Sequence, residues 1–157
     1  MPGPGHTGPL CTVLDTKFCL PALSGMLTHF LFTFGRLHAL THIQNMKADG
    51  HPIQAAVASR TDEPRWARIC MDHLVLGDGS TTLSDVFGDF VEINYGSKIG
   101  HIERLHRKSG IALEEMAFFD NERWNIQDVQ AGLPVKCYYT PEKERYISVL
   151  QNSFTIR

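Results

Sequence analysis

Short apolar runs alternate with amphipathic segments along most of this 157-residue chain. The Ile53–Ala58 run is almost entirely small and apolar, a pattern typical of a strand buried on both faces of a parallel sheet. Other strand-length runs are Leu10–Leu14, Phe90–Ile93, Met116–Phe119 and Pro134–Tyr138. Strands that alternate with helical segments over short links predict an α/β fold with a parallel sheet.

The segments between these runs carry residues that start and stop helices. Pro64 fits the first turn of a helix that Thr61 or Asp62 would cap and that extends to about Leu74. A turn-rich surface loop is expected over residues 77–82. The other expected helices span about 27–47, before Gly50; 97–108, before Gly110; a short stretch after residue 120 that ends near Gly132; and the start of 140–157.

Residues 18–35 contain no Asp, Glu, Lys or Arg, and their length approaches the ~20 residues of a membrane span. Polar and helix-breaking residues such as Pro21, Gly25 and His29 interrupt this stretch. Residues 1–9, with three Pro and three Gly, lack the positive charge that opens a signal sequence. We therefore expect a flexible tail over 1–9, followed later by a loop and a buried helix.

The composition is that of one globular domain, which we expect to span residues 10–157. The chain is 43% hydrophobic and has a net charge of −2 from 15 basic and 17 acidic residues. Interspersed charges of this kind disfavour nucleic-acid and anionic-membrane partners. Four scattered cysteines without a CxxC pair favour reduced thiols, and hence a cytoplasmic protein that we expect to be a monomer.

Four successive expected strands deliver polar side chains at or just beyond their ends: Asp15, Ser59, Lys98 and Asp120. The carboxyl ends of parallel strands form the crevice in which α/β proteins bind ligands. One carboxylate could attack a phosphoryl group, a hydroxyl and an ammonium could hold its oxygens, and a second carboxylate could bind Mg²⁺. This set of residues indicates phosphoryl transfer. The alternative for Asp120–Asn121 is that they only cap the following helix.

Three segments carry a family resemblance: 55–61 (AAVASRT), 95–105 (YGSKIGHIERL) and 118–126 (FFDNERWNI). They resemble the second, third and fourth motifs of the magnesium-dependent phosphatase family, within the haloacid-dehalogenase-like superfamily. The likeness covers residues 52–138 and implies a three-layer, Rossmann-like parallel sheet. It also implies that Ser59 and Arg60 bind phosphoryl oxygens, that Lys98 stabilises a phospho-aspartyl intermediate, and that Asp120, beside Asn121, binds Mg²⁺.

The first motif of that family, Asp-x-Asp-x-Thr, matches less well, and residues 10–51 diverge from the family. Asp15 fits the nucleophile and a second Mg²⁺ ligand, but Lys17 and Cys19 stand where the acid-base Asp and the Thr belong. The family's small cap hairpin is not recognisable, so the cap is expected to be reduced or absent.

The resemblance implies a Mg²⁺-dependent phosphomonoester hydrolase that acts on phosphotyrosine, phosphosugars or other small phosphorylated substrates through phosphorylation of Asp15. The alternative is a catalytically impaired relative that serves as a phosphate-binding or interaction protein. Two observations favour this alternative: Lys17 in place of the acid-base Asp, and the missing cap.

Overall fold

The fold is described from a computed structural model, in which residues 10–14, 39–60 and 63–140 are described. Several expectations fall on residues outside these ranges. They are the tail over 1–9, the first-motif residues Asp15, Lys17 and Cys19, the family's cap hairpin and the start of the first helix within 15–38, and the helix after Thr140.

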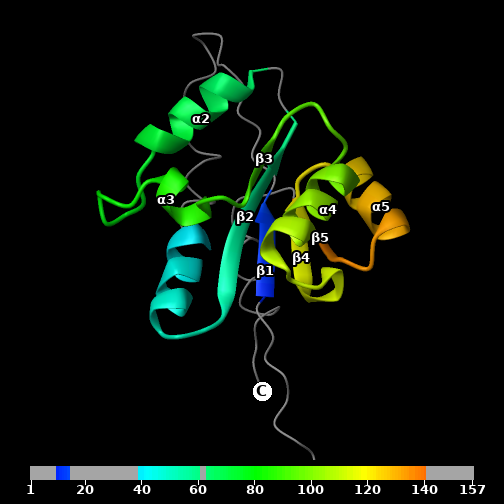
Figure 1. The fold of residues 1–157 in the computed structure, drawn as a ribbon, viewed down its shortest axis with the longest axis horizontal. Helices are drawn as coiled ribbons and strands as arrows, with labels where there is room; N and C mark the ends of the chain where they lie inside the picture. Colours follow the sequence, from blue (N-terminus) through cyan, green and yellow to red (C-terminus); the bar gives the residue numbers. More distant parts are fainter. Residues whose placement is uncertain (1–9, 15–38, 61–62, 141–157) are drawn as a thin grey trace, which may run out of the picture.

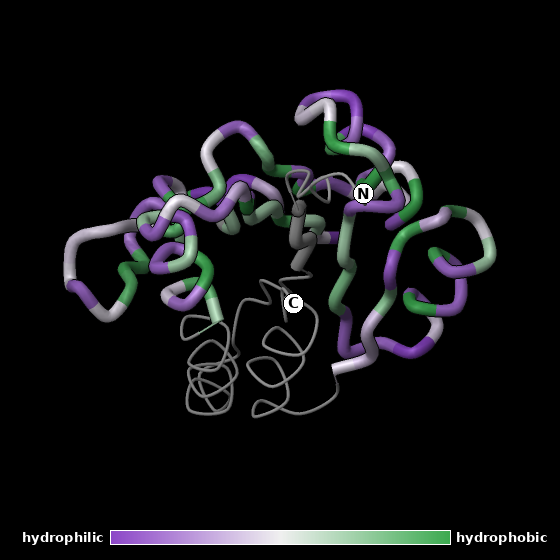
Figure 2. Tube along the Cα trace, turned by 90° about the horizontal axis from the view of Figure 1, so that it is seen from below, coloured by the Kyte–Doolittle hydropathy of each residue, from purple (hydrophilic) through white to green (hydrophobic). Residues whose placement is uncertain are grey.

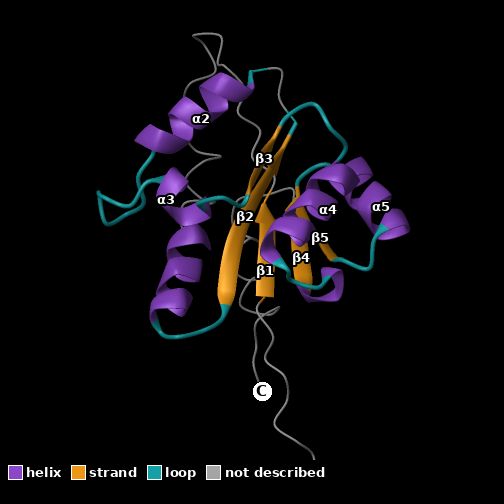
Figure 3. Cartoon of the chain, viewed as in Figure 1, coloured by secondary structure: helices purple, strands orange, loops and turns teal. Residues whose placement is uncertain are grey.

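The described strands form one parallel sheet in the order β3-β2-β1-β4-β5 (Figure 3). They are β1 (Leu10–Leu14), β2 (Ile53–Ser59), β3 (Val91–Ile93), β4 (Met116–Asp120) and β5 (Lys136–Tyr139). The chain builds outward from β1 to β3 and then returns to the other side of β1 to add β4 and β5. The strand order therefore reverses beside β1, and this is where open α/β sheets bind their ligands.

Helices cover both faces of the sheet, which confirms the three-layer α/β prediction (Figure 1). One face packs against α4 (Lys98–Ser109) and α5 (Arg123–Gly132). The other face packs against the helical residues 39–48, α2 (Pro64–His73) and α3 (Leu83–Phe87), and a short 3₁₀ turn, η1 (Leu113–Glu115), leads into β4. Hydrophobic and hydrophilic stretches alternate along the helices, as expected where one side of a helix covers a sheet (Figure 2).

Strands β2 and β4 are largely apolar because both of their faces are buried. Phe118 and Phe119 are each fully buried, but Phe118 packs on the side of α4 and α5 while Phe119 packs on the opposite side. Successive side chains of a strand point to opposite faces, so a continuous apolar run fills both cores. The same division separates Ala56 from Val57 in β2.

The helix limits follow local capping chemistry, with two corrections to the sequence prediction. Ser97 caps α4 by accepting a hydrogen bond from the Gly100 N–H at 3.0 Å, and Gly110 ends this helix at a φ of 70°, as expected. The cap of α2 is Glu63 and not Thr61 or Asp62, and Glu63 makes no side-chain capping bond.

Helix α3 was not predicted. Thr82 and Asp85 form a reciprocal capping box at its start, where Thr82 Oγ1 accepts from the Asp85 N–H and Asp85 accepts from the Thr82 N–H. The turn-rich loop therefore ends at a helix start. Among the described residues, no helix combines the length and the apolar character that crossing a bilayer would need.

Candidate active site at the carboxyl edge of the sheet

Three of the predicted site residues converge where the strand order reverses. Ser59 ends β2, Asp120 ends β4, and Lys98 is the first residue of α4; all three are buried. Lys98 Nζ lies 3.9 Å from Asp120 Oδ2 and donates a hydrogen bond to the carbonyl oxygen of Ala58 at 2.7 Å. An ammonium group therefore bridges the ends of two strands.

Strand β1 runs between the strands that carry Ser59 and Asp120. Its last residue, Leu14, pairs with Val57 on one side and with Phe119 on the other. Asp15, the expected nucleophile, lies outside the described residues.

The carboxylate of Asp120 is held in place by the segment that follows it. Oδ1 accepts the backbone N–H of Glu122 at 2.6 Å, and Oδ2 accepts the side-chain amide of Asn125 at 2.9 Å. The cap position of α5 is Glu122, so the alternative in which Asp120–Asn121 cap this helix is wrong. Asp120 is the last strand residue, and its backbone carbonyl accepts the Thr140 N–H at 2.9 Å.

Asn125 is a site residue that the sequence prediction missed. Its side chain is 2% exposed on α5, beside the buried Ile126 and Val129. A polar side chain on the buried face of an amphipathic helix needs a hydrogen-bond partner, and here that partner is Asp120. The position of Asn125 on the apolar face was the available signal.

Lys98 occupies a position that helix electrostatics disfavour. The amino end of a helix carries a partial positive charge, and a buried ammonium must be paired to be tolerated. Lys98 is 4% exposed, and the nearby Asp120 carboxylate and Ala58 carbonyl supply this compensation.

Arg60 lies at the exposed rim of the same edge. Its guanidinium carbon is 5.6 Å from the centroid of the Trp124 ring, a cation–π distance, and Trp124 is 47% exposed. The structure therefore places Arg60 beside an aromatic ring next to the buried Ser59.

The oxygen atoms at the end of β4 fit a hard cation. Asn121 Oδ1 is buried and has no hydrogen-bond partner among the residues that the structure describes, and it follows directly on the carboxylate of Asp120. Mg²⁺ takes one or two carboxylates and completes its shell with water. Within the described ranges, no cluster of three or more His, Cys, Asp or Glu side chains could hold a metal, so a site built for zinc is not found there.

Two curated proteins show sequence similarity to part of the chain. This chain is 43% identical to magnesium-dependent phosphatase 1 of Homo sapiens over 89 residues. The aligned segment covers 55% of this chain and 44% of that protein. It is 33% identical over 95 residues to a HAD-like hydrolase superfamily protein of Schizosaccharomyces pombe, covering 60% and 52% respectively. The chain thus spans about half the length of the curated relatives it matches.

Solved structures share the fold at low sequence identity. The N-terminal part of a Bacteroides fragilis protein, which contains a phosphatase domain and was solved with Mg, superposes with a TM-score of 0.68 at 16% identity, over 97% of this chain and 42% of that one. A HAD family enzyme of Bacteroides thetaiotaomicron gives 0.51 at 11% identity, over 84% and 93%. The sequence model of the family described as Acid Phosphatase matches residues 33–152. The chain therefore belongs to the acid phosphatase family and has the haloacid-dehalogenase-like fold.

Proposed function

We propose that this chain is a Mg²⁺-dependent phosphomonoester hydrolase. The observation that carries the proposal is the buried Lys98 ammonium, which lies 3.9 Å from the Asp120 carboxylate where the strand order reverses. A buried cation and carboxylate cost folding free energy, and such groups cluster where a charged ligand is bound and transformed. Similarity to a human magnesium-dependent phosphatase supports the same reaction.

Each described residue has a role that its chemistry suits. The ammonium of Lys98 would neutralise charge on the phosphoryl oxygens, and the hydroxyl of Ser59 would donate to one of them. Asp120 and Asn121 would hold Mg²⁺, which when bound supplies further neutralisation of phosphoryl charge. Arg60, at the rim, would bind an anionic oxygen of the entering substrate. Asn125 would keep the Asp120 carboxylate oriented.

The reaction would proceed through Asp15. A carboxylate oxygen of Asp15 would form a bond to phosphorus while the bond from phosphorus to the ester oxygen breaks, and the leaving oxygen would take up a proton and depart as an alcohol or, from phosphotyrosine, as a phenol. Water would then attack the phosphorus of the acyl phosphate, releasing inorganic phosphate and restoring the carboxylate. Phosphotyrosine and phosphosugars are the substrate classes that we propose to test first.

Purified full-length protein should release phosphate from para-nitrophenyl phosphate only when Mg²⁺ is present. Asp120→Asn should lower this Mg²⁺-dependent rate by at least 10²-fold, because the carboxylate that binds the cation is lost. Asp128→Asn, on the exposed side of α5, is the matched control and should retain the parental rate. Equal rates for the parent and Asp120→Asn would exclude the proposed role of this site.

Lys17 supports a second candidate function, that of a phosphate-binding protein with impaired turnover. A lysine ammonium titrates near 10.4, so at neutral pH it can donate a proton to a leaving oxygen but is rarely free to accept one from water.

If Lys17 stands in the acid-base position, Lys17→Asp should raise turnover by roughly 10-fold or more, mainly by faster hydrolysis of the phospho-aspartate. A folded Lys17→Asp variant no faster than the parent would remove Lys17 from that position.

The second function predicts a different pair of results. Inorganic phosphate should raise the melting temperature of the parent but not of Lys98→Ala, while no turnover is measured. The absence of a thermal shift with phosphate would remove this candidate.

We further infer that residues 10–157 form one monomeric domain of a cytoplasmic protein, preceded by a tail over 1–9. The low net charge and the scattered cysteines support this inference. Gel filtration coupled to light scattering tests the monomer, and limited proteolysis tests the domain limits.

A further inference from the structure

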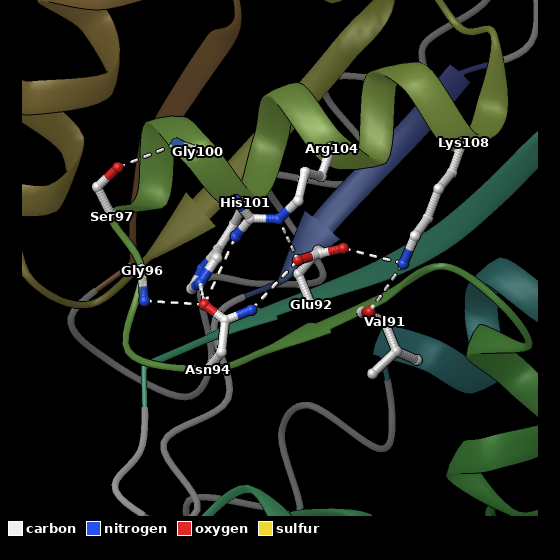
Figure 4. Close-up of polar contacts among 9 residues, drawn as sticks. All are labelled: Val91, Glu92, Asn94, Gly96, Ser97, Gly100, His101, Arg104 and Lys108. Atoms are coloured by element: carbon white, nitrogen blue, oxygen red, sulfur yellow. Dashed lines mark hydrogen bonds and ion pairs between the residues drawn. The ribbon is translucent and has the colours of Figure 1, made fainter.

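A buried polar network joins β3 to α4 beside the proposed active site (Figure 4). We call it the Asn94 network, and its members are Glu92, Asn94, Gly96, His101 and Arg104. Glu92 and His101 are 6% and 0% exposed, so these polar groups are withdrawn from water. Buried polar groups are tolerated when they are paired, and the geometry of such a network is correspondingly well defined.

The Asn94 side chain is at the centre of this network. Its Nδ2 donates to Glu92 Oε2 at 3.3 Å. Its Oδ1 accepts from the Gly96 N–H at 2.8 Å and from Arg104 Nη2 at 3.5 Å, and lies 2.8 Å from His101 Nε2. A carboxylate only accepts hydrogen bonds, so the amide nitrogen must face Glu92 and the amide oxygen must face His101. His101 Nε2 therefore carries the hydrogen.

The backbone of Gly96 passes close to this network. A Cβ atom at residue 96 would lie 2.8 Å from Asn94 Oδ1, 3.2 Å from Arg104 Nη2 and 3.3 Å from His101 Nε2. The first distance is shorter than a carbon–oxygen contact allows, so any side chain here would displace the amide. A residue other than glycine at this position would therefore require the Asn94 side chain to move.

Asn94 contacts both segments that carry Ser59 and Lys98, the first through its backbone and the second through its side chain. The Asn94 backbone N–H donates to the carbonyl oxygen of Ser59 at 3.1 Å, while its side chain holds the N–H of Gly96, two residues before Lys98. Lys98 in turn reaches back to the carbonyl oxygen of Ala58. Asn94 thus sets the path of the turn between the end of β3 and the start of α4.

We propose that Asn94 is a positioning residue for Lys98, an inference that rests on the proposed phosphatase function. Its side chain fixes the turn over residues 94–97 and so places the Lys98 ammonium relative to Ser59 and Asp120. Charge stabilisation depends on donors held in advance at the position where charge develops, and a shift of about 1 Å in a positioned group can cost roughly 10²-fold in rate.

A double-mutant cycle separates this role from a purely structural one. Asn94→Ala should lower kcat at 25 °C at least 10-fold in the parent and by less than twofold in the Lys98→Ala background, because Asn94 acts through the ammonium. KM should change less than kcat. Asn45→Ala, an exposed asparagine of the helical residues 39–48, is the matched control and should leave kcat unchanged. Equal fold losses of kcat in both backgrounds would overturn the proposal.

A second readout keeps the test independent of turnover. With ¹³C-labelled lysine, the Lys98 Cε signal, assigned by its loss in Lys98→Arg, should shift in Asn94→Ala and stay unchanged in Asn45→Ala. A Lys98 signal at its parental position in Asn94→Ala would overturn the inference. Absence of turnover in the parent would instead count against the proposed function alone, because the lysine signal still reports whether Asn94 positions Lys98.

If circular dichroism shows that Asn94→Ala does not fold, Gly96→Ala takes its place in both experiments. Its added methyl group displaces Asn94 Oδ1 without removing any hydrogen-bonding group. The same shift of the Lys98 signal and the same loss of kcat are expected. A folded Gly96→Ala with an unchanged signal and unchanged kcat would contradict the proposal.

Discussion

The Glu92 carboxylate should stabilise the fold in a manner that depends on pH. It is 6% exposed and forms ion pairs with Arg104 Nε at 2.6 Å and with Lys108 Nζ at 2.9 Å. Breaking a fully buried pair costs about 3–5 kcal/mol, whereas an exposed pair contributes about 0–1 kcal/mol. The Arg104 and Lys108 side chains are 37% and 43% exposed. The contribution of each pair should therefore be close to the upper value for an exposed pair, about 1 kcal/mol.

At about 1 kcal/mol for each of the two ion pairs, Glu92→Gln should lower the free energy of unfolding by about 2 kcal/mol at pH 7. For a protein of this size the melting temperature should fall by roughly 4–8 °C. The assay is urea unfolding followed by circular dichroism. Glu103→Gln, an exposed glutamate of the same helix, is the control and should change the free energy by less than about 0.5 kcal/mol.

The pKa of Glu92 gives the sign of the pH dependence. Burial raises this pKa, but the hydrogen bonds from Arg104 and Lys108 outweigh burial, so the pKa in the folded state lies below the usual value of 4.5. The contribution of Glu92 is therefore present above pH 4.5 and is lost as the pH falls through its folded pKa. The difference between the parent and Glu92→Gln should shrink between pH 7 and pH 3.5. A difference below 0.5 kcal/mol at pH 7, or one that does not shrink, would refute this reasoning.

Two further predictions concern the helix stop and the thiols. Gly110→Ala should lower the free energy of unfolding by about 1 kcal/mol, because residue 110 has a φ of 70°, while Gly77→Ala should have a smaller effect; urea unfolding measures both. Burial raises the pKa of the Cys137 thiol to about 11, so iodoacetamide at pH 8 should modify the exposed Cys70 well before Cys137, as measured by peptide mass spectrometry. Equal rates of modification would contradict the burial of Cys137.

The sequence predicts the elements of this fold whose determinants are local. Helix α4 was delimited to within one residue because Ser97 and Gly110 cap it at both ends. Strand β4 was recognised because a sheet buried on both faces requires a continuous apolar run. Helix α3 was missed because it is five residues long and its capping box uses Asp85 in place of the more familiar Glu or Gln.

The sequence predicts the candidate site residues that follow from strand ends, but not the residues that hold them in place. Lys98 and Asp120 could be inferred because parallel topology brings such ends together. Asn125 and Asn94 could not be assigned roles, because their partners depend on how helices pack on the sheet: Asn125 of α5 bonds the Asp120 carboxylate of β4, and the Asn94 side chain contacts His101 and Arg104 of α4. The place of Asn125 on the apolar face of a helix indicates a buried partner but does not identify that partner.

Calorimetric titration of Mg²⁺ into the full-length protein tests most directly whether the carboxyl edge of β4 is the magnesium site. We expect one Mg²⁺ bound per chain, with affinity at least 10-fold weaker in Asp120→Asn because a carboxylate ligand is replaced by an amide. Asp128→Asn, exposed on α5, should bind as tightly as the parent. Unchanged Mg²⁺ affinity in Asp120→Asn would contradict the account.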